Sequence, residues 1–259
     1  MITPTKTIAK KPRAALEDFP HGWRYEYAKT PEGESEPTYI PLTPEEALHP
    51  EEGYIMPERT KHDQICDDIC DMLRPRYVDQ TDVAVFHDLI IEWNHPEIKG
   101  HSPNIAVVPN VRDRDVNRGK FYVAKEGTRP ILIIEVVSPG SKAADRVKKV
   151  DHYARVGVRE YVYIDYWENN GETNWEIFGF RLHGNHYLPM LPDEERSLYL
   201  ETVGLRIGIE DGQVWLQDYE TGEHLLTNLQ ARQVAEARIA ELEAQLTALQ
   251  ASQKSPPEV

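Results

Sequence analysis

The sequence has few cysteines, a deficit of positive charge and no long apolar run. Its 259 residues include two cysteines, and its 29 Lys and Arg face 44 Asp and Glu, for a formal net charge of −15. Cys66 and Cys70 lie four residues apart in a helical pattern, which matches neither a zinc ribbon nor a redox pair, so we expect buried, reduced thiols. The absence of a membrane-length apolar stretch or a signal-peptide core predicts a cytoplasmic protein without membrane contact.

The distribution of charge modifies the first impression that this chain avoids nucleic acids. Phosphate contacts need Lys and Arg, and the overall charge has the wrong sign for them. Residues 100–165, however, contain 12 Lys and Arg against 8 Asp and Glu, a local balance of +4. Within that stretch, residues 110–129 form a basic segment, long enough to be a hairpin or a mobile loop, that either grips a phosphate backbone or is a solvated charged loop. The composition is therefore compatible with DNA binding without favouring it.

The most informative segment is the apolar run at residues 131–137, which contains a single carboxylate, Glu135. A continuous run of this kind predicts a strand that is covered on both faces of a sheet. A carboxylate inside it is costly unless a cation, a basic partner or a hydrogen-bond network compensates its charge. Glu135 is therefore either a site residue or a structural glutamate with satisfied hydrogen bonds.

Polar and basic residues surround this strand in the sequence. Asn104 precedes a second apolar run at residues 105–108 and is placed to reach the same site. A helix is predicted at about residues 141–156, with an apolar stripe for packing on the sheet: Ala143, Val147, Val150 and Ala154. Beside the stripe lies a flank that is either a solvated basic face or part of the site: Lys142, Arg146, Lys149 and Tyr153.

Taken together, these residues carry a resemblance to a known family. The segment is similar to the Uma-type family of proposed endonucleases, which belongs to the restriction-endonuclease-like PD-(D/E)xK superfamily. The resemblance covers roughly residues 40–225 and is most specific between residues 130 and 165. The matching positions are Pro103-Asn104, Ile134-Glu135-Val136, Ser138-Pro139, Asp145-Arg146, Lys149, Tyr153-Ala154, Gly157-Val158, Glu160-Tyr161 and Asp165.

The resemblance implies a metal-dependent nuclease site with two departures from the superfamily pattern. Val137 occupies the usual lysine position, so the lysine role passes to Lys149 on the following helix. Asn104 stands where the family has aspartate, which removes a negative charge from the metal site. An oxygen-ligated divalent cation, Mg²⁺ or Mn²⁺, is the implied cofactor. Glu135 and Asn104 are its implied ligands, and Lys149 stabilises developing charge.

The Asn104 departure leaves two outcomes open. Either another carboxylate compensates, with Asp88 the best candidate and Asp145 a further support, or the protein has lost strong cleavage activity. The predicted function is therefore metal-dependent cleavage of DNA. Its alternative is a catalytically inactive nuclease-fold protein that binds nucleic acid or a protein partner. His62, near the start of a helix at residues 61–74, occupies a position where the family often has histidine, although a surface or capping role is the commoner explanation.

We expect an α/β restriction-endonuclease-like fold, with a mixed sheet flanked by helices. Residues 1–60 are predicted to form an irregular N-terminal arm, residues 61–226 the nuclease-like domain and residues 227–259 a helical tail. Within the domain, strands are expected near residues 82–93, 103–108, 131–137 and 160–166. A β-rich extension follows Trp167, with turns at residues 184–185 and 211–212.

The tail has a short coiled-coil pattern. Its apolar positions are Ala235, Ile239, Leu242, Leu246 and Leu249. This spacing of four and three predicts a seam that is buried against another helix, either in a homodimer or on the chain's own globular body. Only about two heptads fit the pattern, so a solvated single helix is the competing prediction.

Overall fold

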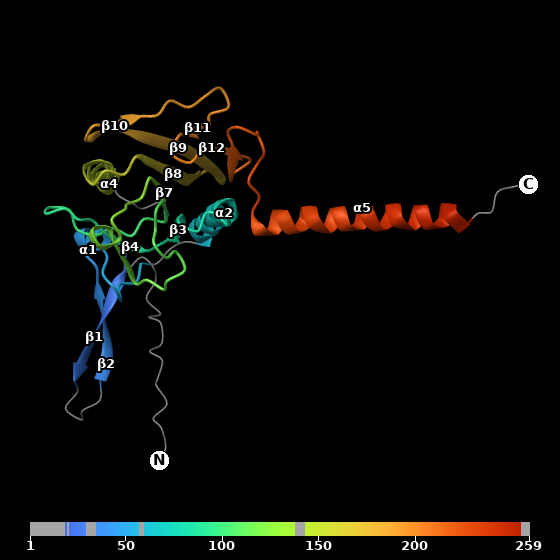
Figure 1. The fold of residues 1–259 in the computed structure, drawn as a ribbon. Coiled ribbons are helices and arrows are strands. Elements are labelled where there is room, and N and C mark those ends of the chain that lie inside the picture. Colours follow the sequence, from blue (N-terminus) through green and yellow to red (C-terminus); the bar gives the residue numbers. More distant parts are fainter. Residues whose placement is uncertain (1–18, 20, 30–34, 57–59, 138–142, 255–259) are drawn as a thin grey trace, which may run out of the picture.

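A central mixed sheet organises the molecule (Figure 1). The computed structural model describes residues 19, 21–29, 35–56, 60–137 and 143–254. In spatial order, the strands of the central sheet are β10 (His186–Pro189), β9 (Glu172–His183), β8 (Glu160–Asn169), β7 (Leu132–Val137), β5 (Ile105–Val108) and β3 (Ala84–His87). β7 and β8 pair in parallel and the other neighbours pair antiparallel, so the predicted mixed sheet is confirmed.

Strand β7 lies inside this sheet, as its apolar sequence predicts. All six of its residues are buried. Leu132, Ile134 and Val136 pack on one face, where helix α2 (Thr60–Arg76) covers the sheet, while Ile133 packs on the opposite face. That opposite face carries helix α4 (Ala143–Arg155). Glu135 alternates with Ile134 and Val136 along the strand, and its side chain is directed to the α4 side.

Helix α4 is present as predicted, but its packed face differs from the predicted stripe. Val147 is 70% exposed, whereas Tyr153 is completely buried against the sheet. The inward face is therefore rotated toward the flank that carries Lys149 and Tyr153. The aromatic ring of Tyr153 fills the space that the predicted stripe assigned to smaller aliphatic residues. The helix ends as predicted at Gly157, whose φ of 81° permits the bond from the Val158 amide to the Tyr153 carbonyl.

Two predicted segments have more structure than the sequence suggested. The strand predicted at residues 82–93 is two strands, because Asp88, with φ 49°, turns the chain between them. The second piece belongs to a different sheet, and the basic segment at residues 110–129 also contains regular elements. These elements are β4 (Ile90–Glu92), which pairs in parallel with β6 (Lys120–Tyr122), and the helical turn α3 (Val123–Glu126).

The β-rich extension divides between two sheets. β9 and β10 extend the central sheet, and a three-stranded antiparallel sheet packs its apolar side chains into the α2-side core. Its strands are β11 (Leu198–Leu200), β12 (Leu205–Glu210) and β13 (Gln213–Asp218). The predicted turns are confirmed by positive φ values at Gly184 and at Asp211 and Gly212. The Ser138-Pro139 positions of the family resemblance and the start of the helix predicted from about residue 141 lie outside the described residues.

The N-terminal region contains a regular hairpin and a short helix. Strands β1 (Trp23–Lys29) and β2 (Ser35–Pro41) pair antiparallel and project from the body (Figure 1). Helix α1 (Pro44–Leu48) begins with Thr43 and Glu46 in a reciprocal capping box. Its buried Leu48, and His49 just after it, lie against the globular body. An irregular arm with short local elements is the prediction for this region, and these described elements are more regular than it suggests.

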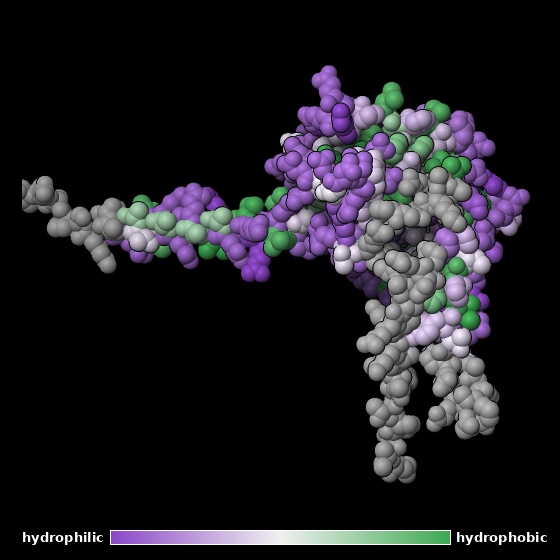
Figure 2. Space-filling view, turned by 180° about the vertical axis from the view of Figure 1, so that it is seen from behind, coloured by the Kyte–Doolittle hydropathy of each residue, from purple (hydrophilic) through white to green (hydrophobic). Residues whose placement is uncertain are grey.

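The remaining predictions concern the cysteines, the tail and the membrane. Cys66 and Cys70 are buried thiols in α2, as predicted, and burial raises the pKa of the Cys70 thiol to about 11. Helix α5 (Asn228–Lys254) projects away from the body with its predicted seam exposed (Figure 2). No helix among the described residues is both long and apolar enough to cross a membrane. The cytoplasmic location stays a prediction.

Candidate metal and phosphodiester site

The residues expected to form the site come from three neighbouring strands. Glu135 lies in β7, Asn104 immediately precedes β5, and Asp88 immediately follows β3. The β5–β7 register pairs Ile105 with Ile134, so one further step places Asn104 opposite Glu135. β3 is the next strand beyond β5. The sheet topology therefore brings together residues that are separated by 16 and 31 positions in the sequence.

Glu135 is a buried carboxylate with a basic partner. It is 4% exposed, and its Oε1 accepts a hydrogen bond of 2.8 Å from Lys149 Nζ and another of 2.8 Å from the Tyr153 hydroxyl. Burial and the adjacent Glu135 raise the pKa of Tyr153 well above its ordinary value, so the phenol remains a hydrogen-bond donor. Within the described part of the chain, Glu135 Oε2 accepts no hydrogen bond. This oxygen is therefore the one available to a further ligand.

Asn104 connects the Glu135 strand to Asp88. Its Oδ1 accepts a 2.9 Å hydrogen bond from the Val136 amide, and its Nδ2 donates to Asp88 Oδ1 at 3.2 Å. The backbone makes a parallel link, since the Asp88 amide donates to the Asn104 carbonyl at 3.1 Å. An aspartate could form the first bond but could not donate the second. The asparagine thus fits a site in which one carboxylate, Asp88, remains beside it.

Asp88 is the most solvent-accessible of the proposed oxygen ligands. Its side chain is 41% exposed, and its Oδ2 lies 3.2 Å from His87 Nε2. Asp is among the residues that tolerate a left-handed backbone, which accounts for this residue at the sharp turn between β3 and β4. The turn directs the carboxylate toward Asn104 instead of along the sheet.

The two lysines in the middle of α4 point in different directions. Lys149 contacts Glu135, whereas Lys148 is 50% exposed and lies 3.3 Å from Glu45 on α1. Neighbouring residues in a helix are separated by 100° of rotation, so only one of the two can face the sheet. The structure thus places Lys149, and not Lys148, beside Glu135, while its catalytic role stays a prediction. The side chain of Asp145 lies outside the described residues.

Two site neighbours were missed or misjudged from the sequence. His62 is 4% exposed, so the surface interpretation is wrong, and its Nε2 lies 3.3 Å from Asn104 Oδ1. Its spacing before Cys66 and Ile69 on α2 was the available signal that it faces the core. Tyr153 was assigned only to a helix flank. Its hydrogen bond to Glu135 depends on how α4 is rotated, which local sequence does not determine.

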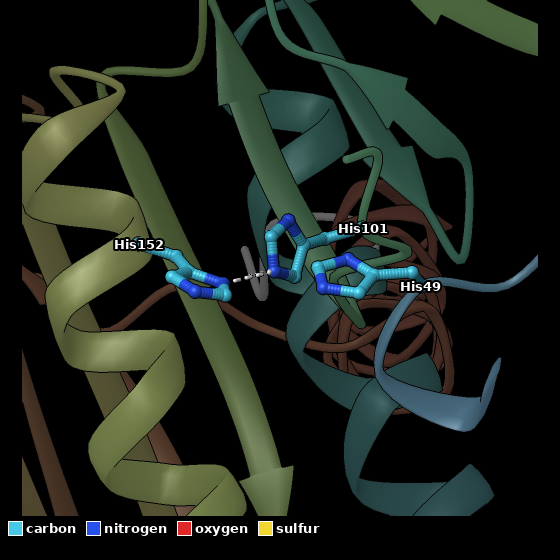
Figure 3. A group of neighbouring side chains, drawn as sticks. All are labelled: His49, His101 and His152. Atoms are coloured by element: carbon cyan, nitrogen blue, oxygen red, sulfur yellow. Dashed lines mark hydrogen bonds between the residues drawn. The ribbon is translucent and has the colours of Figure 1, made fainter. Parts of the chain in front are cut away.

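A group of three histidines near this site was not anticipated, because the sequence scatters them. His49, His101 and His152 are about fifty residues apart in the chain but adjacent in space (Figure 3). Burial, with smaller contributions from His49 and Lys149, lowers the pKa of His101 well below its ordinary value. The pKa of His152 is also lowered, first by burial and then by His49. These two rings are therefore neutral near pH 7.

The basic residues of the 110–129 segment are largely engaged within the protein. Arg114 donates to three backbone carbonyls after α2, Arg118 pairs with Glu126, and Lys120 pairs with Glu92. Arg129 donates to the Val156 carbonyl at the end of α4. These contacts give the segment a structural role, and they argue against it as the main grip on a phosphate backbone.

A family model matches the part of the chain that forms the central sheet. Residues 43–210 match the Uma2 family, described as "Putative restriction endonuclease". The match covers most of the chain, and the protein therefore belongs to this family. The family match begins just before α1 and ends at β12, so the β1–β2 hairpin and α5 lie outside the matched residues.

Comparison with individual proteins adds one solved structure. None of the curated proteins matches the chain. A crystal structure from Anabaena variabilis ATCC 29413, titled as a putative nuclease belonging to DUF820, is 18% identical in sequence. The match covers 49% of this chain and 74% of that one, with a TM-score of 0.35.

Proposed function

We propose that this protein cleaves DNA phosphodiester bonds with the help of a divalent cation, Mg²⁺ or Mn²⁺. The observation that carries the proposal is the 2.8 Å contact between Glu135 and Lys149, on the strand and helix where the Uma2 family match lies. A buried carboxylate beside an ammonium group is the arrangement that this chemistry needs. The carboxylate binds the cation, and the ammonium stabilises charge that develops on the phosphate.

The donors around Glu135 fit a hard cation. Glu135 and Asp88 offer carboxylate oxygens, which Mg²⁺ and Mn²⁺ prefer over nitrogen or sulfur. Asn104 Oδ1 already receives the Val136 amide and faces His62, so we propose that it is the weakest of the three ligands. A bound cation would neutralise phosphate charge in this site. The negative charge of Asp88 then replaces the one that Asn104 lacks.

Tyr153 would orient the Glu135 carboxylate, and Lys149 would contact the phosphate. Tyr153 donates to the same Glu135 oxygen as Lys149, so it helps to fix the carboxylate's rotamer and leaves Oε2 without a hydrogen bond in the described part of the chain. Lys149 is 26% exposed, which keeps its ammonium group accessible to a phosphate. DNA would therefore approach along the edge of the sheet where β7 ends and α4 begins.

A second candidate function is a nuclease-fold protein that binds DNA without cutting it. Asn104 favours this alternative, because its amide already satisfies the hydrogen-bonding groups around it without any cation. In that case the Glu135–Lys149 pair would be a structural ion pair between β7 and α4. The two functions differ in whether the protein cleaves bound DNA when a divalent cation is added.

A plasmid-nicking assay distinguishes them. We expect supercoiled DNA to be converted to open circles by the full-length protein in Mg²⁺ or Mn²⁺ and not in EDTA. Binding of the same DNA without any conversion in either cation would support the inactive alternative and contradict the proposed activity.

Restoring the family's aspartate at position 104 should make the protein's thermal stability depend on a bound metal ion. In Asn104→Asp, a second carboxylate oxygen replaces the amide nitrogen that lies 3.2 Å from Asp88 Oδ1. Two carboxylates this close repel each other unless a cation or a proton lies between them. We therefore expect the Tm in EDTA to fall by about 2–6 °C. Mn²⁺ should restore it, and calorimetry should show at least about tenfold tighter metal binding with faster nicking.

Asn94→Asp is the matched control, because it adds the same charge at an exposed position. It should change neither metal affinity nor the metal dependence of the Tm. If Asn104→Asp behaves like this control, Asn104 does not face the cation.

We also propose that α5 mediates homodimerisation. Its seam residues are roughly half exposed or more, at 56% for Ile239, 47% for Leu242, 59% for Leu246 and 62% for Leu249. The helix is anchored at its start, where Asn228 Nδ2 donates to Asp71 Oδ1 on α2 at 2.7 Å. Beyond that anchor it leaves the body (Figure 1), so the chain's own globular part does not cover the seam.

Removal of the tail should therefore convert the dimer to a monomer. Deleting residues 227–259 should lower the mass measured by light scattering from dimer to monomer without unfolding the sheet domain. Leu242→Glu with Leu246→Glu should have the same effect, whereas Ala244→Glu with Ala248→Glu adds equal charge on the opposite side of the helix and should not. A full-length chain that is already monomeric at high micromolar concentration would exclude the homodimer.

A further inference from the structure

The three histidines lie where separate parts of the fold meet. His49 follows α1, His101 lies between β4 and β5, and His152 belongs to the last turn of α4. One ring nitrogen of each lies within 4.8 Å of the others. The rings of His49 and His152 are stacked with centroids 5.6 Å apart, and His101 meets both edge-on (Figure 3). Three imidazoles therefore converge on one small volume.

Two of the hydrogen-bond partners can act only as a donor or only as an acceptor, so they determine which ring nitrogens carry the protons. The Trp93 indole N–H can only donate, so His101 Nδ1 accepts its 2.7 Å bond and His101 carries its proton on Nε2. That Nε2–H donates to His152 Nδ1 at 3.1 Å. A backbone carbonyl can only accept, so His49 Nδ1 donates to Gly100 at 3.0 Å. This bond leaves His49 Nε2 as the nitrogen for a metal, with the ring oriented by a carbonyl as metal-binding histidines usually are.

The site has an opening and a nearby negative charge. His49 lines a pocket of about 250 Å³ together with Gly100, Glu45, Glu92 and other residues. The Glu45 Oε1 atom lies 3.6 Å from His49 Nε2. His101 is completely buried, while His49 and His152 are partly exposed. A small cation can thus reach His49 through this pocket, whose glutamates outnumber its lysines, and Glu45 is close enough to act as a further ligand.

We propose that His49, His101 and His152 bind a transition-metal ion, with Zn²⁺ the best fit, at a site separate from Glu135. Imidazole nitrogens suit Zn²⁺, Co²⁺ and Ni²⁺, whereas the oxygen donors around Glu135 suit Mg²⁺ and Mn²⁺. With Zn–N bonds of about 2.1 Å, tetrahedral ligand atoms lie about 3.4 Å apart. The 3.1 Å between His101 Nε2 and His152 Nδ1 already approaches this spacing, and a ring nitrogen of His49 lies within 4.8 Å of a ring nitrogen of each of them.

The Trp93 hydrogen bond opposes this binding and so provides a specific test. A metal on His101 Nε2 displaces the proton there, and the neutral ring must then carry its proton on Nδ1. That proton faces the Trp93 N–H, so the hydrogen bond is lost. Trp93→Phe removes the competing donor and keeps an aromatic ring in the buried position. We therefore expect it to strengthen metal binding by about tenfold.

The ion would join α4 to α1 and to the segment before β5. His152 precedes Tyr153, which holds Glu135, so a bound ion would fix the helix that supplies Lys149. Binding should raise the Tm in proportion to the logarithm of metal concentration above the Kd. This role depends on the histidines alone, and it stands whether or not the protein cuts DNA.

The test uses tag-free full-length protein titrated with Co²⁺ in millimolar Mg²⁺, monitored by visible absorption and calorimetry, followed by displacement with Zn²⁺. We expect one equivalent to bind, at a Kd of about 1 µM or tighter, with the visible absorption of four-coordinate Co²⁺. His152→Gln, at a partly exposed position, should weaken binding at least about tenfold. Exposed His183→Gln is the matched control and should bind like the parent.

Glu135→Gln separates this site from the proposed nuclease site. It should retain full Co²⁺ binding at the histidines, whatever it does to Mg²⁺ or to cleavage. The proposal is overturned if no stoichiometric binding is seen, or if His152→Gln binds Co²⁺ as tightly as the parent. Weaker binding in Trp93→Phe than in the parent would also contradict it.

Discussion

Glu135→Gln should reduce DNA nicking by at least about a hundredfold and weaken Mn²⁺ binding in parallel. The substitution keeps the shape of the side chain and removes only its charge. Its amide oxygen can still accept the Tyr153 hydroxyl bond, so the packing of α4 on β7 should remain. The fold should unfold cooperatively near the parent Tm. Calorimetric Mn²⁺ titration, the nicking assay and thermal unfolding measured on one preparation check these three expectations.

Glu160→Gln is the matched control for this experiment. Glu160 is also a fully buried carboxylate, and it lies on β8, the strand next to β7. The Glu160→Gln variant should be less stable than the parent protein but bind Mn²⁺ with the same affinity. Equal Mn²⁺ affinity in Glu135→Gln and the parent would refute the assignment of Glu135 as a metal ligand, whatever happens to the nicking rate.

The contrast between the two carboxylates explains this expectation. Glu160 uses both oxygens within the protein: Oε1 accepts from Arg181 and the Glu201 amide, and Oε2 accepts from Thr202. Glu135 uses one oxygen for two donors and leaves the other without a hydrogen bond in the described part of the chain. A saturated carboxylate is a structural ion-pair partner, whereas a half-used one beside an ammonium group has room for a ligand.

Burial and local periodicity predicted the centre of the fold well. An apolar run without alternation is buried on both faces wherever it occurs, so residues 131–137 predict a central strand before any topology is known. The 100° rotation per helical residue predicts only that Lys148 and Lys149 cannot both face the sheet, and Lys149 is favoured because it shares a helix flank with Tyr153. The described structure confirms the buried central strand and places Lys149 beside Glu135.

Features that depend on distant neighbours could not be predicted. Val147 continues a regular apolar spacing, yet it is exposed because the ring of Tyr153 sets the rotation of α4 on the sheet. The periodicity of α2 indicates that His62 faces the core, but its contact with Asn104, which precedes β5, could not be predicted from it. The three-histidine cluster has no spacing signal, because its members approach only after the sheet, α1 and α4 have assembled.

Lys149→Met should lower the nicking rate by about 10²–10⁴-fold without weakening metal binding. Methionine fills much of the same volume beside Glu135 but cannot donate a proton or stabilise a negative charge. The ammonium group now occupies Glu135 Oε1 at 2.8 Å, so its removal also takes away a positive charge that repels the cation. Mn²⁺ affinity measured by calorimetry should therefore equal or exceed that of the parent, while nicking in saturating Mn²⁺ is lost.

Lys148→Met removes the same charge one position earlier on α4 and is the matched control. Lys148 contacts Glu45 on the surface, and exposed ion pairs of this kind contribute little to stability. Its loss should change the nicking rate by less than about threefold, through the weaker general attraction of DNA. A large loss in Lys148→Met with little change in Lys149→Met would mean that α4 presents its other face to the phosphate. The Glu135–Lys149 contact would then be only the ion pair that holds this helix to the sheet.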